Sequence, residues 1–214
     1  EQGNILWQNV LGGTEVDIMR SIQSSKDNGF ICVGNSESGI SGVKTEKNFG
    51  NEDVWVVKLD SVGNLQWQVN LGGETSEDCN AVIQTHDGGY LVGGYSASNI
   101  SGNKYENRVG QYDYWIIKLD SIGNIVWQNT IGGIDTDYVY DGFQSSEGEF
   151  LIGGDSSSGI SMDKITNSNG SSDFWLVKLT SNYNSIEGKA FADLNSDSIQ
   201  NNLEPGISNT KITQ

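Results

Sequence analysis

The chain repeats itself with a period of 60 residues. A segment of the form GN-x-x-WQ-x-x-[LI]-GG begins at residues 3, 63 and 123, and the motif D-x-W-x-x-K-L begins at residues 53, 113 and 173. A period of this length is typical of repeat architectures, in which each repeat is one supersecondary unit that packs on its neighbours. We therefore divide residues 1–182 into repeats at 3–62, 63–122 and 123–182, and treat residues 183–214 as a separate segment.

Each repeat predicts four short β-strands. In the second repeat, the alternating segment 78–85 is predicted to place Cys79, Ala81 and Ile83 on one face, and the turn sequence HDGG follows it. Residues 90–95 are apolar on both faces, residues 114–119 alternate again, and the turn DSIG leads into the alternating segment 124–131. Period-two alternation between glycine-containing turns is typical of strands. The sequence thus predicts an all-β fold.

Four antiparallel strands per repeat would form the blade of a β-propeller. In this interpretation residues 81–83 lie in the innermost strand and the WQ segment lies in the outermost one. Residues 3–11 would then be an outer strand without the other strands of its blade, and residues 175–179 a third strand without a fourth. Because three blades fall below the usual four to eight, we expect the chain to be part of a larger ring, or else to close by oligomerising. A stacked β-solenoid is the structural alternative, although a 60-residue rung would be long for one.

Composition excludes several classes of partner. The chain has 28 Asp and Glu against 12 Lys and Arg, a net charge of −16, and its acidic residues are spread evenly over the repeats. Nucleic-acid binding needs clustered Lys and Arg, so we expect no nucleic-acid partner. No apolar run of about 18 residues is present, so we expect no membrane insertion. Cys32 and Cys79 read as small buried hydrophobes, with a disulfide between them as the alternative.

The long connections of the repeats are the expected binding surface. Strand direction alternates, so the connections 36–53, 96–113 and 156–173 should share one face with the links from one repeat to the next. Long loops on a rigid scaffold often carry binding sites; solvated loops without a ligand are the alternative. The candidate residues of this ligand face are Glu74, Glu77, Asp78, Glu106 and Asp113.

The combined pattern resembles a known repeat family. D-x-W-[VIL]-[VI]-K-L-[DT]-S, then GN-x-x-WQ-x-x-[LI]-GG, then Q-[ST]-x-[DE]-G-[GE]-[FY]-[LI], is similar to the seven-bladed β-propeller-type repeats of secreted bacterial proteins, which are frequent in large surface proteins of Bacteroidetes. The resemblance covers residues 1–182 and implies an extracellular, non-enzymatic propeller inside a multidomain protein. It supplies no catalytic residues. The third repeat departs from the second, since Glu147 replaces Asp87 and Glu149 replaces Gly89.

The tail contains a calcium-loop pattern. Residues 193–204 read D-x-N-x-D-S-I-x-N-x-x-E, with oxygen-bearing side chains at offsets 1, 3, 5, 9 and 12 of an EF-hand-type loop. Ser198 stands where the EF-hand has Gly, and Pro205 disfavours an exiting helix; an acidic turn without metal is the alternative. The candidate Ca²⁺ ligands are Asp193, Asn195, Asp197, Ile199 through its carbonyl, Asn201 through water, and Glu204.

The sequence around this loop resembles a second family. I-x-G-x-x-F-x-D-x-N-x-D…E-P-G-I is similar to the B-type repeat of serine-aspartate surface adhesins, a calcium-binding, prealbumin-like β-sandwich. Residues 183–214 would be only the beginning of such a module. Together the two resemblances imply a non-enzymatic binding or structural scaffold of a secreted or cell-surface protein, related to adhesion, with an extracellular protein or glycan as partner. The alternative function is lectin-like glycan binding through the long-loop face.

Overall fold

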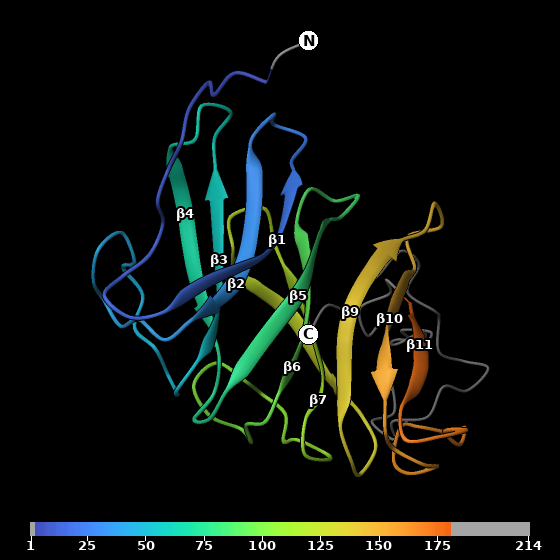
Figure 1. The fold of residues 1–214 in the computed structure, drawn as a ribbon. Coiled ribbons are helices and arrows are strands. Elements are labelled where there is room, and N and C mark those ends of the chain that lie inside the picture. The colour runs from blue at the N-terminus through green and yellow to red at the C-terminus, as the bar shows by residue number, and fades with distance from the viewer. Residues whose placement is uncertain (1–2, 181–214) are drawn as a thin grey trace, which may run out of the picture. The chain divides into compact units, whose positions relative to one another are not determined.

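The computed structural model describes residues 3–180 and contains eleven strands and no helix in that range (Figure 1). The first sheet contains β1 (Asp17–Ser24), β2 (Phe30–Ser36), β3 (Asp53–Leu59) and β4 (Leu65–Leu71). The second sheet contains β5 (Glu77–Gln84), β6 (Tyr90–Ser96), β7 (Asp113–Leu119) and β8 (Ile125–Ile131). The third sheet contains β9 (Asp137–Gln144), β10 (Phe150–Ser156) and β11 (Asp173–Leu179).

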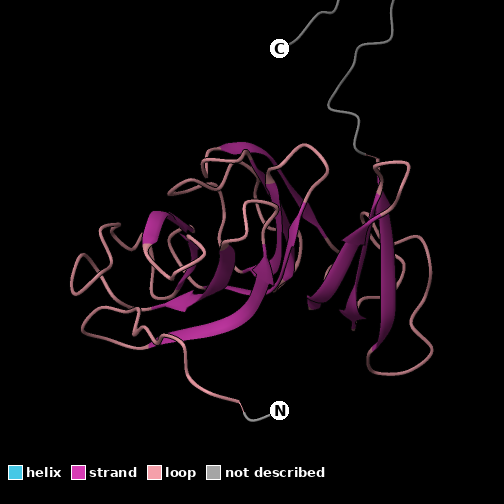
Figure 2. Cartoon of the chain, turned by 90° about the horizontal axis from the view of Figure 1, so that it is seen from above, coloured by secondary structure: helices cyan, strands magenta, loops and turns pink. Residues whose placement is uncertain are grey.

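Each repeat forms its own antiparallel sheet. Strands consecutive in sequence pair with one another, so the sheet orders are β1-β2-β3-β4, β5-β6-β7-β8 and β9-β10-β11. The all-β prediction is confirmed, and the observed strands of the second repeat begin and end within one residue of the predicted ones. Figure 2 shows these strands from above, joined by long loops. No closed ring is present in residues 3–180, and no helix in this range is long and apolar enough to cross a membrane.

One predicted strand is absent. Residues 3–11, which the repeat pattern assigns to an outermost strand, are not part of any sheet. Their counterparts β4 and β8 are strands because β3 and β7 lie beside them and supply backbone hydrogen-bond partners. Alternation alone does not make a strand, since the backbone groups need a partner chain to pair with.

The core lies between the sheets. One apolar cluster joins Val54 and Val56 of the first sheet to Trp115 and Ile117 of the second. A second cluster joins Tyr114 and Ile116, on the opposite face of the second sheet, to the third sheet. The second sheet is therefore buried on both faces, which explains why β7 is buried along its whole length.

The innermost strands contain a β-bulge that the sequence reading missed. The pairing of β5 with β6 shifts between Cys79 and Ala81, so Asn80 is the extra residue. A bulge reverses the alternation that follows it. Cys79 and Val82 therefore face the first sheet, whereas Ile83 faces the third, and the prediction that Cys79 and Ile83 share a face is wrong.

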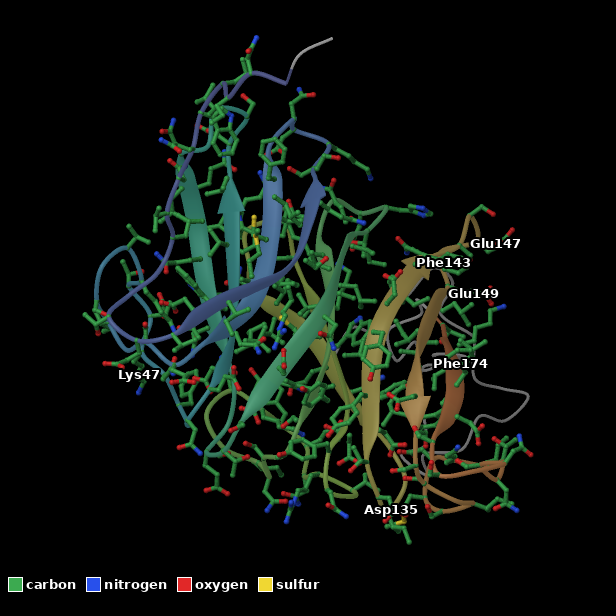
Figure 3. All side chains as sticks on the ribbon, viewed as in Figure 1. Lys47, Asp135, Phe143, Glu147, Glu149 and Phe174 are labelled. Carbon is green, nitrogen blue, oxygen red and sulfur yellow. The ribbon has the colours of Figure 1, made fainter. Side chains whose placement is uncertain are left out.

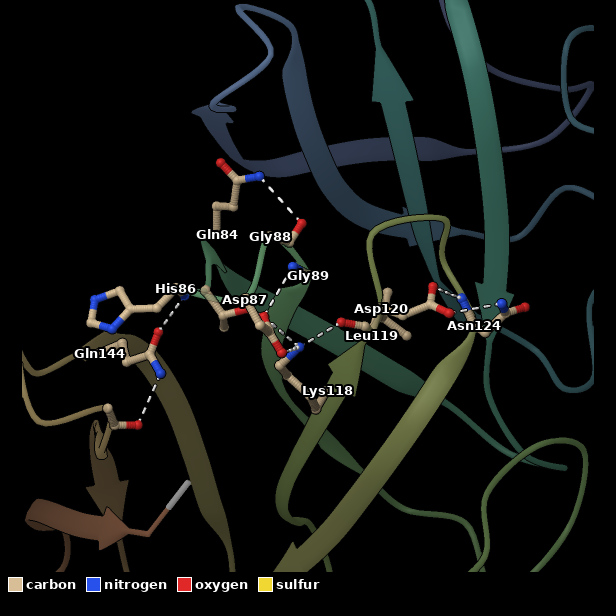
Figure 4. Close-up of polar contacts among 12 residues, drawn as sticks. Gln84, His86, Asp87, Gly88, Gly89, Lys118, Leu119, Asp120, Asn124 and Gln144 are labelled. Atoms are coloured by element: carbon tan, nitrogen blue, oxygen red, sulfur yellow. Dashed lines mark hydrogen bonds and ion pairs between the residues drawn. The ribbon is translucent and has the colours of Figure 1, made fainter. Parts of the chain in front are cut away.

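A buried lysine fixes the tight turn between the first two strands of each complete sheet. Lys118, which is 3% exposed, lies 3.0 Å from the Asp87 carboxylate of the turn and donates to the Leu119 carbonyl oxygen at 2.8 Å (Figure 4). The first sheet repeats this arrangement, and there the hydrogen bond from Lys58 to Asp27 lowers the pKa of the Asp27 carboxyl to about 2. The turn is thus held by an ion pair with one buried partner.

The third sheet lacks this buried pair. A Cβ atom at Gly89 would lie 2.4 Å from Lys118 Nζ, so a side chain there is incompatible with the buried lysine. The third repeat has Glu149 at that position, and Lys178 is correspondingly exposed and paired with Glu149 at 2.6 Å. The third sheet thus differs in its turn residues and, among the described residues, in having no fourth strand beside β11, and its ion pair lies at the surface.

We expect Asp87→Ala to lower the free energy of unfolding by about 1–3 kcal/mol, because it leaves the buried Lys118 ammonium without its carboxylate. The matched control is Glu149→Ala, which breaks an exposed pair and should change stability by less than about 0.5 kcal/mol. Urea unfolding followed by tryptophan fluorescence would measure both. Equal losses in the two variants would contradict this account of the turn.

Candidate functional site

The long connections lie at one end of the sheets, and their backbone groups form hydrogen bonds with the start of the next sheet. The loop that follows β6 donates from Gln111 N to the Asp135 carbonyl oxygen at 2.9 Å, and Asp137 N donates back to the Tyr112 carbonyl oxygen at 2.8 Å. The first and second sheets are joined in the same way, through Asn51 and Glu77. In Figure 3, Asp135 marks this loop end of the third sheet and Glu147 marks the opposite, tight-turn end.

A carboxylate at the start of each inner strand holds the glycine-containing link that precedes it. Glu77 accepts a hydrogen bond from Gly73 N at 2.7 Å and another from Ser96 Oγ at 2.7 Å. Asp17 and Asp137 accept the equivalent bonds from Gly13 N and Gly133 N at 2.7 and 2.8 Å. These carboxylates position the loop end, although Asp137 Oδ1 is buried without a hydrogen bond among the described residues.

A second carboxylate, at the start of β7, holds the loop that leads into that strand. Asp113 is fully buried and accepts hydrogen bonds from Val109 N at 2.7 Å and Gly110 N at 2.9 Å. Burial raises the pKa of the Asp113 carboxyl above its ordinary value, and it does the same for the equivalent Asp53. Charged groups are retained in such places only when neighbouring donors satisfy them.

Each long loop also contains one buried lysine. Lys104 is 1% exposed, donates to the Glu106 carbonyl oxygen at 2.7 Å and to Thr130 Oγ1 at 2.6 Å, and lies 5.8 Å from the centre of the Trp115 ring. Lys44 has the same relation to Trp55. Burial lowers the pKa of Lys104. The tryptophans at this end thus support loop lysines, in keeping with a packing role.

A polar cavity opens where the three repeats meet at the loop end. Its volume is about 220 Å³. The rings of Tyr95, Tyr112 and Tyr138 pack on one another, with centroids of neighbouring pairs 4.4–5.7 Å apart. The residues that line the cavity are Glu52, Ser76, Glu77, Asp78, Tyr95, Tyr112 and Tyr138.

Asp78 is held at the wall of this cavity by two hydrogen bonds. Asp78 Oδ2 accepts hydrogen bonds from the Tyr95 hydroxyl at 2.9 Å and from Arg20 Nη2 at 3.2 Å. Asp78 Oδ1 is buried and makes no hydrogen bond within the described part of the chain. Burial raises the pKa values of the Tyr95 and Tyr138 hydroxyls, so both rings carry a proton to donate near neutral pH. The Tyr95 proton is used by Asp78, so the cavity offers the Tyr138 hydroxyl as a donor, the Asp78 carboxylate as an acceptor, and aromatic surface.

The repeats differ from one another at this cavity. The loop framework uses the same residue types in all three repeats, including the lysine, the tryptophan and the carboxylate at the start of each third strand. Glu77, which lines the cavity, belongs to this framework, but three other sets of cavity positions use different residue types. Equivalent residues in the three repeats are Asn35, Tyr95 and Asp155; Glu52, Tyr112 and Ser172; and Ile18, Asp78 and Tyr138.

The residues predicted for the ligand face have different environments. Glu74 and Glu106 are exposed on loops, and Asp78 lines the cavity. Glu77 also lines it but is fully buried and bound to Gly73 and Ser96, and Asp113 is buried in its own loop. The structure brings Glu77 and Asp78 together at the cavity and leaves the other three apart from it.

Sequence reasoning did not identify the three cavity tyrosines. They belong to different strands and loops, and no motif connects them. The available signal was that tyrosine appears at repeat positions where the other repeats have polar, acidic or aliphatic residues.

The predicted calcium ligands between Asp193 and Glu204 lie outside the described residues. Within residues 3–180, no three His, Cys, Asp or Glu side chains gather closely enough to hold a metal ion. Cys32 and Cys79 are both buried free thiols, in agreement with the sequence interpretation.

No protein-family model matches the chain, and no curated protein matches it.

We expect the free energy of unfolding of the Asp113→Asn variant, measured relative to that of the parent protein, to increase with pH. A carboxyl whose folded-state pKa is raised destabilises the fold once it is ionised, so this cost is absent below the unfolded pKa of about 3.9 and appears as the pH rises through the folded pKa. The asparagine oxygen can still accept from the loop N–H groups.

Urea unfolding of parent and variant at about pH 4 and about pH 7 would measure the difference, with the larger gain for the variant expected at the higher pH. Asp53→Asn should repeat the pattern in the first sheet. A difference that is constant across this range would contradict the assignment.

Proposed function

We propose that the chain is a non-enzymatic binding scaffold of a secreted or cell-surface protein, with a role in adhesion. The observation that supports this most directly is the division between a repeated framework and a variable site. The same buried carboxylates and lysines hold the long loops in each repeat. The cavity between the repeats shares Glu77 with this framework, but its Tyr95, Tyr112 and Tyr138 have no tyrosine at the equivalent positions of the other repeats. A rigid scaffold that presents differing loops is a common arrangement for binding proteins.

Lectin-like glycan binding is the second candidate, and the tyrosine cavity favours it. Sugars present hydroxyl groups and apolar ring faces, which match carboxylate acceptors, phenol donors and aromatic surface. The volume of about 220 Å³ is below the 300–1,000 Å³ usual for drug-sized ligands, so the cavity fits one small polar group. A single sugar residue at the end of a glycan chain meets this limit.

A glycan-array screen, run in calcium and again in chelator, is the first experiment. Binding without breakdown of the bound glycan, checked by mass spectrometry, supports the non-enzymatic assignment, and release of a product contradicts it. Binding that persists in chelator separates the cavity from the calcium loop predicted in the tail. A folded protein that binds no glycan in either condition contradicts the lectin function and leaves the scaffold role.

If a glycan binds, we expect Tyr112→Ala to weaken its affinity at least about tenfold, the loss of about 1.4 kcal/mol expected for one aromatic or hydrogen-bonding contact. Tyr105→Ala is the matched control, because Tyr105 is 62% exposed on the same loop and does not line the cavity. Isothermal titration would measure both. Equal affinities for the two variants would exclude the cavity as the glycan site.

A further inference from the structure

Residues 3–11 pack on the first sheet in the same way as β4, the fourth strand of the first sheet, packs on the second sheet. Trp7 packs on Phe30 with ring centroids 5.8 Å apart and an interplanar angle of 60°, and Trp67 of β4 packs on Tyr90 of the second sheet with the same two values. Val43 N donates to the Gly12 carbonyl oxygen at 3.0 Å, just as Asn103 N donates to that of Gly72 at 3.1 Å. The segment thus has the outer-strand position relative to the next repeat.

This segment has no sheet of its own among the described residues. Ile5, Leu6 and Val10 are 81–94% exposed. The segment is therefore fixed on one side, by Trp7 against Phe30, and open on the other.

The third sheet has the opposite deficit. Within residues 3–180 no strand pairs with the outer side of β11, whereas β3 and β7 each have a fourth strand beside them. Phe174 is 93% exposed, Leu176 is 65% exposed and Phe143 of β9 is 53% exposed. Figure 3 labels Phe174 and Phe143 on this sheet. At the equivalent positions in the second sheet, Tyr114 and Ile116 are fully buried between sheets.

The first sheet leaves the complementary face open. A hollow of about 70 Å³ is lined there by apolar residues that include Ile18, Met19 and Trp55. Met19 is 63% exposed and Ile22 is 51% exposed, whereas their equivalents in the second sheet, Cys79 and Val82, are buried against the first sheet. The two open faces are thus the two halves of the interface that already joins consecutive sheets inside the chain.

We propose that a second copy of this chain donates its residues 3–11 as the fourth strand of the third sheet, and that its first sheet covers the open face of that sheet. The register follows from the second sheet, where Tyr114 pairs with Ile131 and Lys118 pairs with Trp127. By equivalence, Phe174 pairs with Leu11 of the other copy and Lys178 pairs with its Trp7.

The side chains needed for this pairing are present. Trp55 Nε1 donates to Gln68 Oε1 and Trp115 Nε1 donates to Gln128 Oε1, both at 3.0 Å. The equivalent partner for Trp175 is Gln8, which the donated strand supplies. Such a head-to-tail contact joins two different surfaces, so each copy is both donor and acceptor.

The first test is the mass of the full 214-residue chain in solution, measured by sedimentation equilibrium over a range of concentrations. We expect multiples of 23.2 kDa for the parent and a single 23.2 kDa species for Phe174→Lys/Leu176→Lys. Both positions are exposed in one copy, so the variant should fold; circular dichroism would check this. Ile160→Lys, at a loop position that is 62% exposed, is the matched control and should associate like the parent. A monomeric parent, or a double variant that associates as well as the control, overturns the proposal.

The second test separates strand donation from simple face-to-face contact. A synthetic peptide of residues 3–11 should dissociate the assembly by occupying the β11 edge. The same peptide with Gln8→Ala should be several-fold less effective, because it lacks the oxygen that would accept the hydrogen bond from Trp175 Nε1, as Gln128 does for Trp115. Failure of the unaltered peptide to dissociate the assembly, or equal action of the two peptides, contradicts donation of this strand.

Discussion

The arrangement at the loop end depends on carboxylates that are removed from water and satisfied by backbone N–H groups. A buried carboxylate without donors would cost several kcal/mol, so the loops close around Glu77 and Asp113 in one conformation. The glycine pair in each link is required by this closeness: a Cβ atom at Gly72 would lie 2.1 Å from Asp53 Oδ1, and one at Gly73 would lie 2.4 Å from Ser98 Cβ. The repeated apolar-Gly-Gly motif is thus required because adjoining sheets leave no room for a side chain at these two positions.

Much of the fold could be predicted because its signals are local. Turn sequences such as HDGG and DSIG and the alternation between them determine the strands of each repeat, and the 60-residue period determines the number of sheets. Two features could not be predicted in this way. The bulge at Asn80 depends on the pairing with β6, and the position of residues 3–11 depends on the absence of a neighbouring strand.

The candidate site was harder to predict than the fold for a related reason. Acidic residues on the loops looked alike in sequence, yet Asp113 is enclosed by its own loop whereas Asp78 faces a cavity. The difference arises from which backbone N–H groups reach each carboxylate. Tyr112 and Tyr138 come together only because the loop after β6 hooks onto the start of β9, a contact between residues of different repeats.

The bulge in the innermost strands of the first and second sheets places one side chain against the sheet that follows. Arg20, the extra residue of β1, bonds to Asp78 of the second sheet, and Asn80, the extra residue of β5, donates to the Val139 carbonyl oxygen of the third at 2.7 Å. Because these residues lie outside the regular ladder, their size can change without disturbing strand pairing. The bulge therefore adds a polar contact between neighbouring inner strands without using any backbone group of its own ladder.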